Sequence, residues 1–261
     1  MFNKIFKILL ILLISSIANA DIQVNSPKEK SFAEIVLKDL LKDTLVNRIN
    51  SLVEEVEATL DEKKLVEVGK LIEDCIEKEH ENFLYYYFLA RVHYSLVNLF
   101  NCVKGDKKRA ERYLESSLKM CQKSIKLNKR FSDSYRLAGD IYGRLLEFKN
   151  PILYGYLYGS KAKRLVEKAI ELDSQNPEGY LARGRNYFFA PPAFGGSKHK
   201  AIKDFEKAIE LCPGYYMSYI WLGEAYFSRG EKEEAKKLFE KALQLEPRSN
   251  WVKYELLNKV K

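Results

Sequence analysis

The hydrophobic residues between Pro213 and Pro247 recur every three or four positions, which is the spacing of one face of an α-helix. The recurrence is interrupted at Gly230, so the segment predicts two amphipathic helices joined by a tight turn. Large residues on one helix face small residues on the other, which lets the two helices pack closely. The positions that carry this pattern are Tyr219, Leu222, Gly223 and Tyr226 in the first helix, and Ala235, Phe239 and Ala242 in the second.

The same pattern occurs again upstream, opening on "YFLARVHY", "YRLAGDIY" and "YLARGRNY". Eleven residues separate the last small residue of one unit from the first tyrosine of the next, as in Ser124–Tyr135, Ala169–Tyr180 and Ala208–Tyr219. A large–small pattern repeated in phase resembles the tetratricopeptide repeat. The resemblance implies an all-α fold, a right-handed superhelix of antiparallel helix pairs, over residues 83–247.

The remaining residues divide around this core. Residues 31–80 match the repeat poorly and predict a degenerate N-terminal helix pair, while residues 21–30 predict a linker. Residues 248–261, "RSNWVKYELLNKVK", predict a helix that caps the last apolar face, which a stack of repeats requires.

Residues 1–20 contain Lys4 and Lys7 near their start, continue through an uncharged apolar run at 8–17 and end in Ala-Asn-Ala. The run is short for a membrane span and ends like a cleavage site, so it predicts a secretory signal peptide removed after Ala20. An uncleaved N-terminal anchor is the alternative. We therefore expect a periplasmic or secreted protein, whose formal net charge falls from +8 to +6 on processing.

The stretch "FFAPPAFGGSKHKAI" at residues 188–202 raises the question of a phosphate-binding loop. Such a loop runs from a strand into a helix and places Lys before Ser or Thr, whereas here both flanks are helical and the order differs. We predict an enlarged turn in which Gly195 and Gly196 adopt positive φ angles and Ser197 caps the next helix. The turn and "KAIKDFEKAIEL" are also similar to the T-component of tripartite ATP-independent periplasmic transporters, which implies an accessory subunit that associates with a solute-binding protein and can form trimers.

Composition and motifs argue against several other functions. Positive and negative charges are finely mixed, which is typical of solvated helix faces and not of nucleic-acid binding. The four cysteines form no recognisable disulfide framework, so mostly buried thiols are expected. No histidine has a second ligand at metal spacing and no nucleophile–base pattern is readable. We predict a protein that is not an enzyme and has no cofactor or metal.

A binding surface is what remains. In this repeat family, ligands usually lie in a concave groove lined by the first helix of each pair, and the mixture of residues here suits an extended peptide or amphipathic segment. The resemblance therefore predicts a protein or peptide partner, such as a periplasmic solute-binding protein. The equivalent groove positions are Tyr87, Arg91, Tyr94, Arg136, Asp140, Leu181, Arg185, Phe188, Ile220, Glu224 and Phe227.

The uncharged segment "PILYGYLYGS" at residues 151–160 predicts a second long connection within a helix pair. Because such turns line up along one edge of a stack, we expect it to neighbour residues 188–196. Tyr156 and Phe194 would then share an exposed apolar patch that binds a partner or a second copy of the chain. Alternatively, each connection folds over its own helix pair as a small additional core.

Overall fold

The computed structural model describes residues 27–249, 252, 253 and 256, with side chains from residue 43 onward except at 151 and 152. The predicted signal peptide lies outside these residues. The chain divides into two units, residues 1–47 and 48–261, and the described part of the first is the beginning of helix α2 (Pro27–Thr59). The predicted linker at 21–30 is therefore wrong at its end, because α2 already includes residues 27–30.

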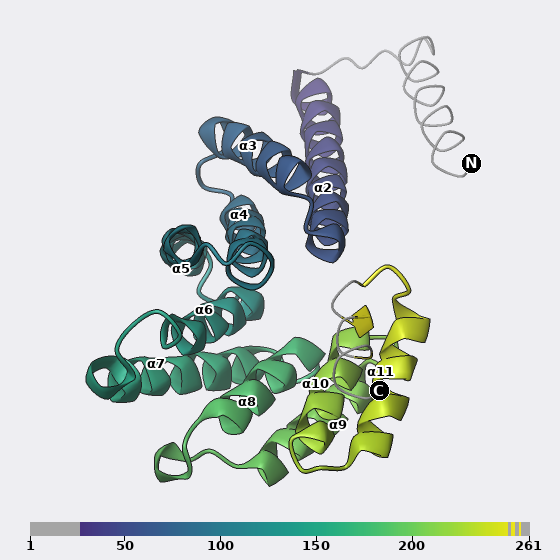
Figure 1. Cartoon of the computed structure of the whole chain (residues 1–261). Coiled ribbons are helices and arrows are strands. Elements are labelled where there is room, and N and C mark those ends of the chain that lie inside the picture. Colours follow the sequence, from purple (N-terminus) through teal and green to yellow (C-terminus); the bar gives the residue numbers. More distant parts are fainter. Residues whose placement is uncertain (1–26, 250–251, 254–255, 257–261) are drawn as a thin grey trace. The chain divides into compact units, whose positions relative to one another are not determined.

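The second unit consists of helices in antiparallel pairs, and successive pairs follow one another in chain order (Figure 1). Helix α3 (Glu62–Lys78) precedes them. No helix in the described part of the chain has both the length and the apolar composition that a bilayer span requires. The pairs are α4 (Phe83–Asn98) with α5 (Lys107–Leu127), α6 (Ser132–Leu145) with α7 (Pro151–Leu172), α8 (Pro177–Phe189) with α9 (Lys198–Leu211), and α10 (Tyr216–Phe227) with α11 (Lys232–Leu245).

The large–small pattern holds each pair together. A Cβ placed on Gly184 of α8 would lie 2.4 Å from the ring of Phe205 on α9, and one on Gly223 of α10 would lie 2.7 Å from Phe239 on α11. Both phenylalanines are completely buried. Only glycine permits this approach of helix backbone to aromatic ring, which explains why the pattern repeats.

The α4–α5 pair achieves the same closeness with serine. Ser117 and Ser124 are fully buried, and a buried hydroxyl requires a hydrogen-bond partner. Ser117 Oγ donates to the carbonyl of Ala90 at 2.7 Å, and Ser124 Oγ donates to that of Phe83 at 2.9 Å. Hydrogen bonding to the partner helix therefore replaces alanine packing at these positions.

The eleven-residue interval between pairs also has a physical basis. The tyrosine near the start of each first helix donates its hydroxyl to the carbonyl six residues upstream, in the preceding turn. These bonds join Tyr86 to His80 (3.0 Å), Tyr135 to Lys129 (3.1 Å), Tyr180 to Ser174 (3.2 Å) and Tyr219 to Pro213 (2.9 Å). The repeated tyrosine thus fastens each inter-pair turn.

The turn at residues 190–197 follows the prediction with one correction. Gly195 has φ 89°, and Ser197 accepts a hydrogen bond from the Lys200 amide as the N-cap of α9. Gly196 does not adopt positive φ. It is required because a Cβ there would lie 1.7 Å from the carbonyl oxygen of Ala190.

The prediction that residues 151–160 form a connection is wrong. They are the beginning of α7, which starts at Pro151, the residue most compatible with a first helical position. Gly155 and Gly159 lower helix propensity, but Tyr158 compensates by packing against Tyr142 of α6 with ring centroids 5.5 Å apart. The true connection between α6 and α7 is residues 146–150.

The four cysteines are free thiols, but only two of them are buried, fewer than expected. Cys75 and Cys121 are buried, whereas Cys212 is half-buried and Cys102 is exposed. Val252 is fully buried and Leu256 packs against the α10–α11 core. Most of the predicted capping helix at 248–261 lies outside the described residues.

His93 of α4 packs beside Tyr113, with ring centroids 5.6 Å apart, and its Nδ1 has no hydrogen-bond partner. Burial lowers its pKa to about 4, below the value of about 6.5 in an unfolded chain. The unfolded state therefore binds the proton more readily, so stability present above about pH 6.5 is lost as the pH falls toward 4. We expect the free energy of unfolding to fall between pH 7 and 4 by about 2 kcal/mol more in the wild type than in His93→Gln, measured by urea titration. Equal losses in the two proteins would refute this.

Candidate functional site

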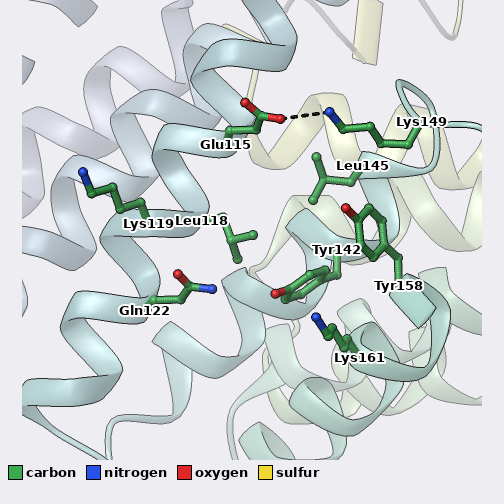
Figure 2. A pocket seen from close by; sticks show the side chains of 9 residues that line it. All are labelled: Glu115, Leu118, Lys119, Gln122, Tyr142, Leu145, Lys149, Tyr158 and Lys161. Carbon is green, nitrogen blue, oxygen red and sulfur yellow. Dashed lines mark hydrogen bonds and ion pairs between the residues drawn. The ribbon is translucent and has the colours of Figure 1, made fainter. Parts of the chain in front are cut away.

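A cleft of about 240 Å³ lies between α5, α6 and α7 (Figure 2). Two of the three lysines that line it have partners in the fold, and the third, Lys119, is exposed. Lys149 Nζ lies 2.6 Å from Glu111 and 2.9 Å from Glu115, and the ammonium of Lys161 lies 5.1 Å from the ring centre of Tyr142. Among the described residues, the lining of this cleft contains no buried donor that lacks a partner.

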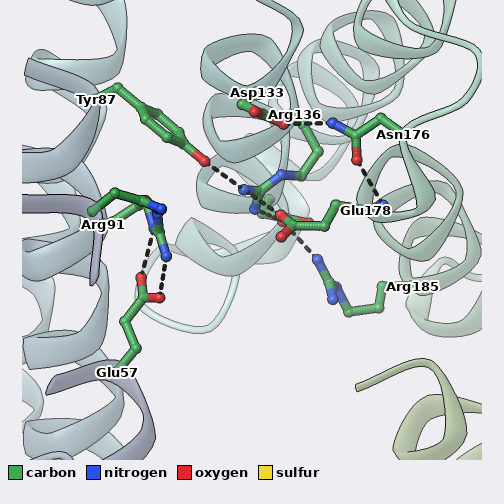
Figure 3. Close-up of polar contacts among 10 residues, drawn as sticks. Glu57, Tyr87, Arg91, Asp133, Arg136, Asn176, Glu178 and Arg185 are labelled. Atoms are coloured by element: carbon green, nitrogen blue, oxygen red, sulfur yellow. Dashed lines mark hydrogen bonds and ion pairs between the residues drawn. The ribbon is translucent and has the colours of Figure 1, made fainter. Parts of the chain in front are cut away.

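A denser set of polar side chains lies where α4, α6 and α8 meet, at the predicted groove positions (Figure 3). We call the surface formed by the predicted groove positions of α4, α6 and α8 the inner face. At its centre is Arg136, which is 9% exposed and contacts three groups. Its guanidinium lies 3.3 Å from Tyr87 Oη, 3.3 Å from Asp140 Oδ2 and 2.5 Å from Glu178 Oε2. Burial alone would lower the pKa of Arg136, but these neighbours raise it, so the guanidinium stays charged.

Asp140 serves two arginines from successive pairs. Its Oδ2 also lies 2.6 Å from Arg185 Nη2 of α8, and the Asp140 side chain is only 4% exposed. The Arg185 guanidinium in turn lies 5.4 Å from the ring centre of Trp221 on α10. One carboxylate therefore ties α6 to α8, and Arg185 extends the contact to α10.

The inner face continues toward the N-terminus through Arg91 of α4. Its guanidinium forms a two-bond ion pair with Glu57, at 2.9 and 2.5 Å, and donates to Asn50 Oδ1 at 2.7 Å. On the other side, Asp133 accepts a 2.6 Å bond from Asn176 while burial raises its pKa. These residues are paired with one another and hold the helices in place.

Arg144 is the exception on this face. It lies two turns beyond Arg136 on α6 and is 13% exposed, yet its close contacts are neutral: Asn98, Cys102 and the ring of Tyr94 at 5.3 Å. Among the described residues, the only acid beside Arg144 is Glu147. Its Oε1 lies 3.7 Å from Arg144 Nε, and its side chain is 54% exposed. Arg144 Nε has no hydrogen-bond partner.

A second unused donor lies close by. A Cβ built on Gly143, the residue before Arg144, would lie 3.5 Å from Oδ1 of Asn186 on α8, so Asn186 lies beside this part of α6. The Nδ2 of Asn186 is buried and has no hydrogen-bond partner. Burial opposes the charge of Arg144, but Tyr94 raises the pKa of Arg144, and the Tyr94 ring centre lies 5.3 Å from this guanidinium. We call Tyr94, Arg144 and Asn186 the Arg144 cluster. It provides hydrogen-bond donors suited to an incoming carboxylate.

Comparison with known proteins relates this arrangement to others. The chain is 41% identical over 86 residues to Tetratricopeptide repeat protein 14 of Mus musculus, covering 30% of this chain and 11% of the relative. Its structure superimposes on a thermophilic tetratricopeptide-repeat protein of Thermus thermophilus with a TM-score of 0.63 at 18% identity, covering 82% of this chain and 98% of the other. The chain therefore has the fold of tetratricopeptide-repeat proteins. The expected fold class, an all-α solenoid of helix pairs, is confirmed.

Two further similarities are to regulators of microtubule dynamics. Residues 186–257 match the family model "Regulator of microtubule dynamics protein 1-3". The chain is also 25% identical over 248 residues to Regulator of microtubule dynamics protein 2 of Homo sapiens, covering 87% of this chain and 57% of that protein. The chain thus spans about a tenth of the mouse relative and little more than half of the human one.

The structure places the predicted groove residues of this repeat protein in three settings. Tyr87, Arg91, Arg136, Asp140 and Arg185 form the polar network. Leu181 and Ile220 are buried in the core, at 1% and 0% exposure, and present no surface to a ligand, because the helices turn these positions toward their own pair. Half-buried positions remain at Tyr94, Phe188, Glu224 and Phe227.

The two predicted edge residues, Tyr156 and Phe194, are exposed by 76% and 64%. These two side chains therefore do not belong to small additional cores, although Tyr158 of the same segment packs on Tyr142 of its own pair. Among the described residues, no ring contact joins the two segments: Tyr154 and Tyr158 contact each other and Tyr142, whereas Phe189 contacts Phe188 and Trp221.

Sequence reasoning missed the acids that pair with the arginines and missed Arg144 itself. Glu57 lies on α2 and Glu178 on α8, each more than thirty residues from the arginine that it pairs with. No local pattern therefore links them to Arg91 and Arg136. Arg144 could have been found, because it follows Arg136 and Asp140 at intervals of four and shares their helix face.

Proposed function

We propose that this protein is an exported, non-enzymatic scaffold that binds a segment of a partner protein along the inner face. A tetratricopeptide-type fold suggests a protein–protein interaction scaffold, and the half-buried aromatic and charged side chains along the inner face support it. Export is supported by the features of residues 1–20, which match a signal peptide removed after Ala20.

The observation that carries this proposal is the Arg144 cluster. A buried guanidinium beside neutral groups is stabilised by an anion, and an unpartnered buried donor costs free energy until a ligand supplies an acceptor. A carboxylate of the bound segment would pair with the Arg144 guanidinium, whose side chain is 13% exposed. The partner segment is therefore acidic at this point and extended along α6 and α8.

The test is affinity capture from the host's own periplasm with the wild type and with Arg144→Gln. We expect Arg144→Gln to weaken capture of a specific partner by about tenfold, because it removes charge-assisted hydrogen bonds. Arg112→Gln is the matched control, since Arg112 is exposed on α5, and it should capture as the wild type does. Circular dichroism confirms that each variant is folded. Equal capture by Arg144→Gln and wild type would assign the contact to another face.

Arg91 and Arg185 are poor probes of the same surface. Each forms an ion pair with a carboxylate of the fold, so reversing its charge would disturb the helices as well as any ligand. The same capture experiment tests export, since the protein recovered from the periplasm should begin at Asp21. Recovery of an intact Met1 in the membrane fraction would contradict it.

The alternative is an accessory subunit of a solute transport system, supported by the similarity of about residues 130–215 to the T-component. A solute-binding protein among the captured partners would favour this alternative. An unrelated envelope protein would favour the general scaffold.

A further inference from the structure

The beginning of α7 extends beyond its pair as an apolar helix end. Helix α7 has 22 residues, whereas α9 and α11 have 14 each, so it is about two turns longer. We call residues 151–160 the α7 tip. Leu153 and Tyr156 are 73% and 76% exposed, Leu157 is 48% exposed, and no residue of the tip is charged.

The exposed side chains share one side of the helix. Leu153, Leu157 and Arg164 are separated by four and seven residues, which places them in one row, and Tyr156 and Lys163 form the adjacent row. At 1.5 Å per residue, Arg164 lies about 10 Å along the axis from Leu157. The helix therefore presents an apolar end followed by Lys163 and Arg164, and Lys163 lies 3.9 Å from the exposed Glu167 one turn further on. We call Lys163 and Arg164 the basic band.

The opposite side of the tip is fastened to the fold. Tyr154 and Tyr158 pack with ring centroids 5.2 Å apart, Tyr158 packs on Tyr142 of α6, and Lys161 covers that ring. This tyrosine stack forms one wall of the cleft in Figure 2. The apolar end is thus held rigidly outward, and nothing lies within 4 Å of a Cβ built on Gly155 or Gly159.

We propose that the α7 tip docks this protein on the surface of an anionic lipid bilayer. Leucine and tyrosine are residues that enter the boundary between headgroups and acyl chains, to a depth of about 5–10 Å. The row from Leu153 to Leu157 spans about 6 Å along the axis and Arg164 lies about 10 Å beyond it, so Lys163 and Arg164 would lie at the level of anionic headgroups when this row enters the boundary. The net charge of +6 after processing favours the same surface.

A protein partner fits this feature less well. A stable protein interface buries about 800 Å² on each side, and lysine is depleted within it. The exposed apolar side chains described on this helix end, Leu153, Tyr154, Tyr156 and Leu157, fall short of that area, and cations follow directly behind them. This surface is separate from the inner face, so lipid docking does not depend on the proposed partner binding.

The test is hydrogen–deuterium exchange of the processed protein, which begins at Asp21, with vesicles of phosphatidylcholine alone or mixed with phosphatidylglycerol. We expect exchange across residues 151–160 to slow with the anionic vesicles and much less with the neutral ones. The apolar run at residues 8–17 is absent from this protein, so its own membrane affinity does not contribute.

Variants define the contact by co-sedimentation with the same vesicles. Leu153→Asp with Tyr156→Asp should weaken binding by about tenfold or more, because both side chains would have to enter the boundary as charges. Phe189→Asp with Phe194→Asp is the matched control, with the same change of charge at exposed aromatics of the next pair. Lys163→Gln with Arg164→Gln should remove most of the preference for anionic vesicles.

Three outcomes would overturn the proposal. One is unchanged exchange in residues 151–160 when anionic vesicles are added. Another is an equal loss of binding in the Phe189/Phe194 control, which would indicate a general charge effect. The third is protection of residues 151–160 that follows protein concentration without vesicles, which would identify the tip as a self-association surface.

Discussion

Replacing Asp140 by alanine is expected to lower the free energy of unfolding by about 3–5 kcal/mol. The substitution leaves Arg136 and Arg185 without their shared carboxylate, and Arg136 is 9% exposed. Removing one member of a buried ion pair costs more than the pair contributes, because the remaining charge has lost both water and its partner. Urea unfolding followed by circular dichroism measures the change.

Two further variants assign this cost to the stranded arginines. Glu147→Ala removes an acid just beyond the C-terminal end of α6, the helix that carries Asp140. Glu147 is 54% exposed, so a loss below about 0.5 kcal/mol in the free energy of unfolding is expected. Asp140→Ala combined with Arg185→Met should be less destabilising than Asp140→Ala alone, since one stranded charge is gone. A loss near ~1 kcal/mol for Asp140→Ala would show that water or the other acids compensate.

The second large effect is expected at Gly184. Replacing it by alanine should lower the free energy of unfolding by about 2–3 kcal/mol. The new methyl would lie 2.4 Å from the ring of Phe205, which is completely buried and has no room to move. The usual preference of a helix for alanine over glycine, about 1 kcal/mol, acts in the opposite direction and is outweighed.

Gly159→Ala is the matched control for this prediction. It is the same substitution inside helix α7, where nothing lies within 4 Å of the added Cβ, so a gain of up to about 1 kcal/mol is expected. Gly184→Ala with Phe205→Leu should recover part of the loss by removing the ring. If both glycine variants shifted stability in the same direction, close packing at Gly184 would not be what the repeat requires.

The helix pairs and their order were predictable because the signals that specify them are local. Hydrophobic residues with a helical period define each amphipathic helix. Small residues at fixed positions, glycine or alanine in the first helix of a pair and alanine or serine in the second, mark where the other helix approaches. The eleven-residue interval was visible for the same reason, since the tyrosine hydroxyl bonds a carbonyl only six residues upstream. Such contacts involve short stretches of chain and leave a regular trace in the sequence.

The beginning of α7 shows where local signals fail. Two glycines and the absence of charge made residues 151–160 resemble a connection, yet they form a helix. The deciding contact is Tyr158 on Tyr142, between residues of different helices. Tertiary packing outweighed weak local propensity.

The candidate site shows the same division. The sequence by itself determined which face of α4, α6 and α8 carries the arginines and aromatics, because helical periodicity assigns residues to faces. Only the tertiary structure decided which of these arginines are neutralised: Glu57 and Glu178 reach Arg91 and Arg136 from other helices, whereas no such acid reaches Arg144 except the exposed Glu147 among the residues described. The reason is physical, since electrostatic pairing depends on distance in space, and a pattern of positions along the chain does not contain that distance.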